Sequence, residues 1–250
     1  FVQAEPERGT PQYGGTVNIL TRHAGLNALS FNQYDWPWKT NHDALFLEHL
    51  AKCDLDFGPR GTGENPFKSL SYIPDQHLTG ELAESWSVEE NPFRIVFNIR
   101  KGVYWPAKEG VMERRELVAE DIVFNYTHMN TSPRKIPTWW DFISEWKAEG
   151  KYTAVAHLQE WNANIGYRLL WGYFSGIAPP EVLQMNDGKG SDDWRLKTGT
   201  GPYKLVDIRP DDIQVYERNE EYWDKETING VAYDLPYNDG IVYHIMGDES

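Results

Sequence analysis

The segment 198–224 constrains the fold of this chain more than any other stretch. It opens with Gly-Thr-Gly-Pro, in which Gly199 and Gly201 can take backbone angles that other residues cannot and the proline fixes its own φ. Apolar and polar residues then alternate on either side of Arg-Pro-Asp-Asp at 209–212, a sequence typical of turns. We therefore expect a β-hairpin whose first strand begins near Tyr203.

Several motifs resemble one protein family. The Gly-Thr-Gly-Pro-Tyr start of the hairpin and the tail Arg-Asn-Glu-Glu-Tyr-Trp at 218–223 look like the signature of the large solute-binding proteins of ABC importers, which include dipeptide-, oligopeptide- and nickel-binding members. Residues 77–129 resemble that family's block of Leu-Ala-Glu-Ser-Trp, a strand, Arg-Lys-Gly-Val-aromatic and a helix beginning Ala-Glu-Asp. Residues 43–55 are similar to its Leu-Phe-Glu-Gly-Leu helix, and residues 14–20 to its first strand. The resemblance therefore covers nearly the whole chain.

This resemblance implies an α/β chain with the two-lobed, type II fold of periplasmic binding proteins and an inserted extra domain. Residues 1–40 and 175–250 would form the first lobe, and residues 41–174 would form the inserted α+β domain. The alternating residues 241–246 look like the strand that precedes the second lobe. We therefore expect that the second lobe is absent from this chain.

The function implied by the resemblance is capture of a solute, not catalysis. Members of this family bind di- or oligopeptides between two lobes, and the closed form is delivered to the membrane permease subunits of an ABC importer. The resemblance thus implies an exported, periplasmic and monomeric binding protein without a cofactor. Its partners would be a peptide ligand and the permease.

The ligand contacts that we expect first lie in segment 21–40, which follows the first predicted strand. This segment lacks a clear period and holds Asn27, Tyr34, Trp36 and Trp38. Loops at the end of a rigid strand are common sites of ligand contact, and aromatic and amide groups offer flat apolar surfaces with hydrogen-bonding edges. The alternative for these aromatic residues is that they seal the strand against the next element.

Two further contact candidates are Trp171 and Tyr173, in the stretch where the chain of this family returns to its first lobe. Packing at the domain junction is the alternative for both. The chain holds 11 Trp, several of them in the dense stretch 133–146. Because tryptophan faces also stack on sugar rings, an oligosaccharide-binding member of the same family is the alternative within the binding class.

Composition excludes some classes of function. The net charge of −14 argues against nucleic acid as a partner, since phosphate binding needs clustered Lys and Arg. The sequence contains no run of about 18 apolar residues, the length that a membrane-spanning helix needs. The single cysteine, Cys53, excludes an internal disulfide and fits a small core residue.

The first residues of the chain leave two interpretations open. Residues 1–4, Phe-Val-Gln-Ala, fit either the last trace of an export signal or an ordinary leader.

No enzyme or metal signature is present in the sequence. Glu81 and Glu84 would suit a carbohydrate-active hydrolase, but their helical spacing is more typical of a solvated helix face. His42 and His49 lack a third ligand at the spacing that zinc requires. A hydrolase that uses a pair of carboxylates remains the alternative outside the binding class.

Periodicity predicts the remaining elements. Residues 16–20 and 151–158 alternate as strands do, and residues 86–100 form a second hairpin around an Asn-Pro turn. Two helices are expected, one over 43–55 and one over 118–129.

Overall fold

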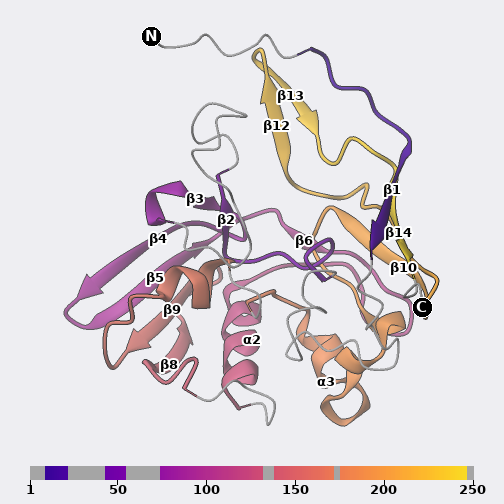
Figure 1. Cartoon of the computed structure of the whole chain (residues 1–250). Coiled ribbons are helices and arrows are strands. Elements are labelled where there is room, and N and C mark those ends of the chain that lie inside the picture. The colour runs from indigo at the N-terminus through magenta and orange to yellow at the C-terminus, as the bar shows by residue number, and fades with distance from the viewer. Residues whose placement is uncertain (1–8, 22–42, 55–73, 132–137, 172–174, 247–250) are drawn as a thin grey trace.

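The computed structural model of this chain describes residues 9–21, 43–54, 74–131, 138–171 and 175–246. Two four-stranded sheets dominate these residues, one in the order β1-β14-β11-β10 and one in the order β4-β5-β9-β8. Figure 1 shows them on opposite sides of the molecule, with helix α2 against the second sheet. A single cluster of buried hydrophobic side chains includes residues of both sheets.

The first sheet joins the two ends of the described chain. Strand β1 (Thr16–Thr21) pairs in parallel with β14 (Gly240–Ile245), although more than 200 residues separate them. Strand β11 (Ile213–Arg218) pairs antiparallel with β14 on one side and with β10 (Tyr203–Arg209) on the other. The hairpin and the two end strands predicted from the sequence are confirmed.

The second sheet is entirely antiparallel. It consists of β4 (Ala83–Glu90), β5 (Phe93–Ile99), β9 (Thr153–Leu158) and β8 (Ile143–Ala148). Helix α2 (Ala119–Thr131) lies against β8 and β9 and buries Ile122, Tyr126 and Met129. The predicted second hairpin, the strand near 151–158 and the helix near 118–129 are thus confirmed.

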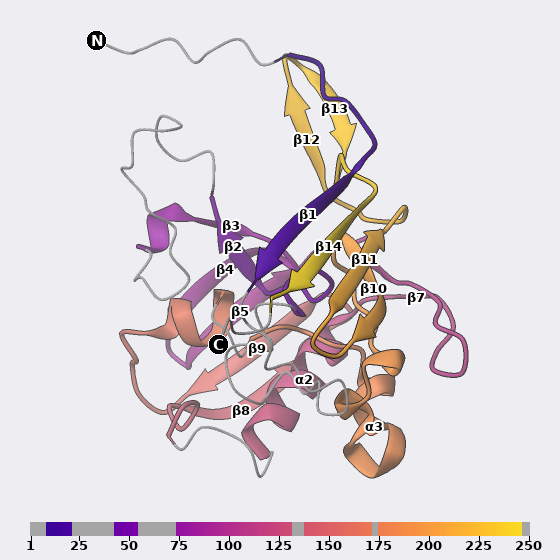
Figure 2. The same ribbon diagram turned by 45° about the vertical axis from the view of Figure 1, so that its right-hand side comes forward.

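Shorter elements lie outside the two large sheets. They are β2 (Ala51–Cys53), β3 (Leu78–Gly80), β6 (Tyr104–Trp105), β7 (Arg115–Glu116), α3 (Pro180–Gly188), β12 (Lys225–Ile228), β13 (Val231–Asp234) and a π-helix at Gly166–Trp171. The β12–β13 hairpin projects away from the body of the molecule (Figures 1 and 2).

The predicted helix over 43–55 is wrong. After a single turn at residues 43–47, in which the Leu47 N–H donates to the Asp43 carbonyl, Glu48 forms an antiparallel bridge with Ile177 and the chain leads into strand β2. Tertiary partners replace the helical hydrogen bonds. The Phe46 carbonyl accepts from the Gly201 N–H at 2.9 Å, and the Leu50 carbonyl accepts from the Ala83 N–H at 2.9 Å. Most of this segment is buried, and only Ala44 among residues 43–53 is exposed, so its apolar residues do not mark the single stripe of a surface helix.

Candidate functional site

Strands β1 and β14 end at the same edge of the first sheet. Thr21 pairs with Ile245 at the last position of the ladder, and the next backbone N–H, of Met246, donates to the Thr21 carbonyl at 2.8 Å. Figure 2 shows the two strands side by side and pointing the same way. In open α/β sheets, ligands bind outside the carboxyl ends of parallel strands. This edge is therefore the candidate solute site.

The outer face of this edge combines a polar pair with exposed apolar groups. His244 on β14 hydrogen-bonds through Nε2 to Oδ1 of Asn18 on β1, at 2.8 Å. Leu20 is 69% exposed and Met246 is 43% exposed. Binding sites for small molecules commonly place a few polar groups among apolar side chains, as this edge does.

The inner face of the same strands belongs to the core. Ile19 and Tyr243 pack against the buried cluster, and the rings of Tyr216 and Tyr243 meet edge to face with centroids 6.0 Å apart. Packing of the inner face against the core therefore fixes the position of this edge.

The ligand contacts predicted from the sequence lie outside what the structure describes. The segment 22–42 carries Asn27, Tyr34, Trp36 and Trp38, and it follows the last residue of β1 directly. All four residues stay predictions. Trp171 closes the π-helix, but its side chain lies outside the described part, as does the whole of Tyr173.

Sequence reasoning missed Asn18 and His244. Each stands at an outward position of a strand that periodicity had found, but neither strand carries a signal for its partner. Only the parallel pairing of β1 with β14 brings the two side chains together.

A buried carboxyl group, Glu48, joins three of the sequence motifs. The Trp223 indole N–H donates to both of its oxygens, and the Tyr222 hydroxyl donates to Oε1 at 3.1 Å. Nearby, Glu81 Oε2 accepts from the His49 backbone N–H at 2.7 Å. The Tyr-Trp tail, the Leu-Phe-Leu-Glu segment and the start of the Leu-Ala-Glu-Ser-Trp block thus meet at one point.

Burial and, to a smaller extent, the neighbouring charge of Glu81 together raise the pKa of Glu48 to about 8. Such a shift is common in catalytic carboxyl groups. Glu48 is only 2% exposed, however, and its described neighbours are packed protein groups. We therefore assign it to the architecture and not to solute binding.

Glu81 and Glu84, the carboxylates considered for a hydrolase, do not lie on a helix, so the predicted helix face is wrong. Glu84 is exposed on strand β4, whereas Glu81 precedes that strand and is buried. The two residues are therefore separated by the start of a strand and do not share a helix face. Among the described residues no group of three or more His, Cys, Asp and Glu side chains could hold a metal ion. No helix in that part of the chain is long and apolar enough to cross a lipid bilayer.

The Gly-Thr-Gly-Pro signature has a structural cause. A Cβ on Gly199 would lie 1.9 Å from the Phe46 carbonyl oxygen, and one on Gly201 would lie 2.8 Å from the Phe46 backbone. Neither glycine has a positive φ, so close approach and not an unusual backbone angle requires them. Asn219, from the tail, donates through Nδ2 to the Gly201 carbonyl at 2.9 Å and through its backbone N–H to the Pro202 carbonyl at 2.8 Å. The tail therefore fixes the start of the hairpin.

Comparison with known proteins identifies the family of this chain. A profile of the bacterial extracellular solute-binding proteins, family 5 (middle), matches residues 77–250, more than half of the chain. The chain belongs to this family. Oligopeptide-binding protein AmiA of Streptococcus pneumoniae is 26% identical over 190 residues, which cover 66% of this chain and 28% of AmiA. Heme-binding protein A of Haemophilus influenzae is 22% identical over 219 residues, which cover 76% of this chain and 39% of that protein.

The fold of this chain is also similar to that of a solved structure. The ABC transporter-associated periplasmic binding protein DppA of Helicobacter pylori, in complex with the peptide STSA, matches with a TM-score of 0.69 at 19% identity. The match covers 94% of this chain and 43% of DppA. The family 5 chain thus has the α/β fold of periplasmic binding proteins, and it spans less than half of the length of each of these three proteins. The domain boundaries expected near residues 40 and 175 stay a prediction.

Proposed function

We propose that this family 5 chain is part of the extracytoplasmic solute-binding component of an ABC importer, and that its solute is a di- or oligopeptide. The observation that carries this proposal is the parallel pairing of β1 with β14. It creates a carboxyl-end edge with Asn18, His244, Leu20 and Met246, and the aromatic segment 22–42 continues directly from it.

Peptide is favoured as the solute class by two of the similar proteins. AmiA is an oligopeptide-binding protein, and the DppA structure contains a bound peptide. An extended peptide presents regularly spaced backbone donors and acceptors, and aromatic side chains accept varied residues without demanding one of them. Segment 22–42 supplies such aromatic groups, together with the amide of Asn27.

The mechanism is capture by differential affinity. A solute that contacts two parts of a binding protein stabilises the closed arrangement relative to the open one. The permease then distinguishes loaded from empty protein by that arrangement. In this mechanism no bond of the solute is broken, and the buried Glu48 keeps its structural role.

Calorimetric titration of the complete gene product that contains this chain tests the proposal. The titrants are di- to pentapeptides and oligosaccharides of matching length. We expect saturable 1:1 binding of peptides, a higher Tm in their presence and no response to sugars. Binding of oligosaccharides alone would overturn the peptide assignment. Release of hydrolysed sugar without peptide binding would overturn the assignment to solute capture.

A further inference from the structure

A small cavity lies at the other end of the first sheet, away from the candidate solute site. Its volume is about 130 Å³, and its lining includes Ala107 and Lys108 from the loop after β6 and Lys197, Thr198 and Lys204 from the start of the hairpin. This volume is well below the roughly 300 Å³ at which pockets for drug-sized molecules begin. At about 30 Å³ for each water, it corresponds to roughly four water molecules. The cavity therefore suits a small ion and not a peptide.

Strand register separates this cavity from the solute site. Lys204 pairs with Glu217, and Glu217 pairs with Gly240, the first residue of β14. The solute edge is at Ile245, the last residue of the same strand. The cavity is thus at the amino end of β14, and a ligand there would not compete with one at the carboxyl end.

The charge of the lining is unusual for this protein. Three lysines line the cavity although the chain has a net charge of −14, and none of the lining residues, all of which belong to the described chain, is acidic. The Lys197 ammonium lies 3.7 Å from the Asp43 carboxylate and balances a buried charge. Lys204 contributes to the lowered pKa of Glu220, so part of its charge is already offset, whereas the pKa of Lys108 is shifted by burial alone. Both lysines line the cavity, and Thr198 adds a hydroxyl group.

Lys108 is the lysine of this lining on which an anion would act most strongly. Its side chain is partly buried, and burial lowers the pKa of its ammonium group without a contribution from a neighbouring carboxylate. The backbone of Lys108 is held in place, because it donates to the Met112 carbonyl at 2.9 Å. A cation that is fixed and partly desolvated gains more from an anion than a solvated surface lysine does.

We propose that this cavity binds a small oxyanion such as phosphate or sulfate, held between Lys108 and Lys204. The lysines come from two segments far apart in the sequence, the loop between β6 and β7 and the Gly-Thr-Gly-Pro hairpin. A bound oxyanion would therefore link these segments by hydrogen bonds from charged donors, which are stronger than neutral ones. The site is independent of the peptide site, so that either can exist without the other.

Thermal unfolding and calorimetric titration of the complete gene product test this site. The probes are sodium phosphate and sodium sulfate, each compared with sodium chloride at equal ionic strength. We expect a saturable rise in Tm with phosphate or sulfate that chloride does not produce. An equal effect of chloride, or no saturable effect of either oxyanion, would overturn the proposal.

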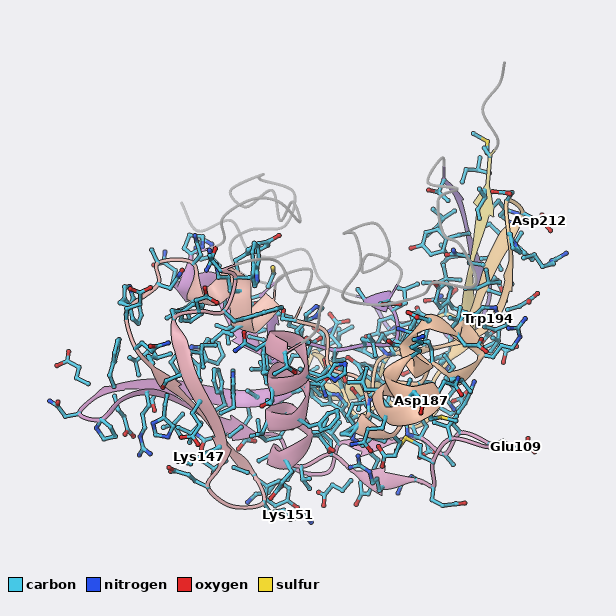
Figure 3. All side chains as sticks on the ribbon, turned by 90° about the horizontal axis from the view of Figure 1, so that it is seen from below. Glu109, Lys147, Lys151, Asp187, Trp194 and Asp212 are labelled. Carbon is cyan, nitrogen blue, oxygen red and sulfur yellow. The ribbon has the colours of Figure 1, made fainter. Side chains whose placement is uncertain are left out.

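Charge-removing variants locate the site. In K108M and K204M the aliphatic stem is largely kept, and we expect the oxyanion affinity to fall by about tenfold or more. K147M is the matched control, since Lys147 is an exposed lysine on β8, on the opposite side of the molecule from Glu109, the neighbour of Lys108 (Figure 3). Without oxyanion, K108M should be at least as stable as the wild type, because the lost charge has no carboxylate partner. Unchanged oxyanion affinity in both K108M and K204M would place the ion elsewhere and refute the assignment.

Discussion

The indole N–H of Trp223 donates to both carboxylate oxygens of Glu48, at 3.0 and 2.9 Å. Lys52 and Arg100 lie over the same indole ring, with the guanidinium carbon of Arg100 4.3 Å from its centroid. The indole thus contacts a buried acid through its N–H edge and two cations through its ring. This arrangement explains why a Tyr-Trp tail accompanies a buried glutamate in the same chain.

Glu48 makes the stability of this protein depend on pH. The pKa of Glu48 is raised from 4.5 to about 8 in the folded state, so that the folded chain binds this proton more tightly than the unfolded chain. The stabilisation is complete below the unfolded pKa and is lost as the pH rises from 4.5 toward 8, by up to about 1.4 kcal/mol for each pH unit. In E48Q this slope should be absent.

Urea unfolding between pH 5 and pH 8 measures this slope. E145Q is the control, because Glu145 is exposed and has its pKa lowered by Lys147, so that it does not titrate in this range. A wild-type slope in E48Q would show that other groups cause the pH dependence.

The role of the glycines gives a second prediction. G199A should destabilise the protein by about 3 kcal/mol, because the new methyl group would overlap the Phe46 carbonyl and force the backbone apart. G176A is the matched control, since its Cβ would meet Leu47 at an ordinary 3.5 Å. Urea denaturation of both variants checks the difference, and equal stability of G199A and G176A would contradict it.

These glycines also show what the sequence could and could not predict. Periodicity and turn chemistry located the hairpin at 203–218, because the signals are local. The reason for Gly199 was not local, since it depends on the position of Phe46 more than 150 residues earlier. The same tertiary contact turned the predicted helix at 43–55 into turns and a short strand. Local propensity is a weak guide wherever buried backbone groups find distant partners.

The candidate site shows the same difference between local sequence signals and contacts that depend on distant segments. The strands β1 and β14 were each predicted, but the parallel pairing that joins Asn18 to His244 spans 226 residues and leaves no trace in either segment. Resemblance to the family indicated the class of protein, and the two strand ends indicated where a solute would meet the sheet. The identity of each contact depends on side-chain positions that periodicity does not encode.

Two adjacent arginines give a third prediction. Arg115 donates to both oxygens of the buried Asp121, at 2.9 and 2.8 Å, and also to Glu181 on α3. Removal of this partner leaves a buried carboxylate uncompensated, so that R115M should lose about 3 kcal/mol of stability. R114M removes the same charge from an exposed pair with Glu221 and should lose less than about 1 kcal/mol. Urea denaturation at pH 7 compares the two variants, and equal losses would refute this role of Arg115.

The last prediction concerns the solute site. Trp36 and Trp38 follow the carboxyl end of β1 in the sequence, and in our proposal they contact the peptide. W36A and W38A should each weaken peptide binding by about tenfold, since burial of a tryptophan face against a ligand contributes on the order of 1–2 kcal/mol. Titration calorimetry measures the affinity, and the Tm without peptide shows whether the fold is intact.

The matched control for these variants is W161A. Trp161 is 57% exposed and stacks on Phe93 of the second sheet, so that it is as accessible as a ligand-binding tryptophan but belongs to another part of the fold. W161A should keep the wild-type affinity. If W36A and W38A bind peptide as tightly as W161A does, segment 22–42 is not the solute-binding segment, and the solute must meet the sheet edge through other residues.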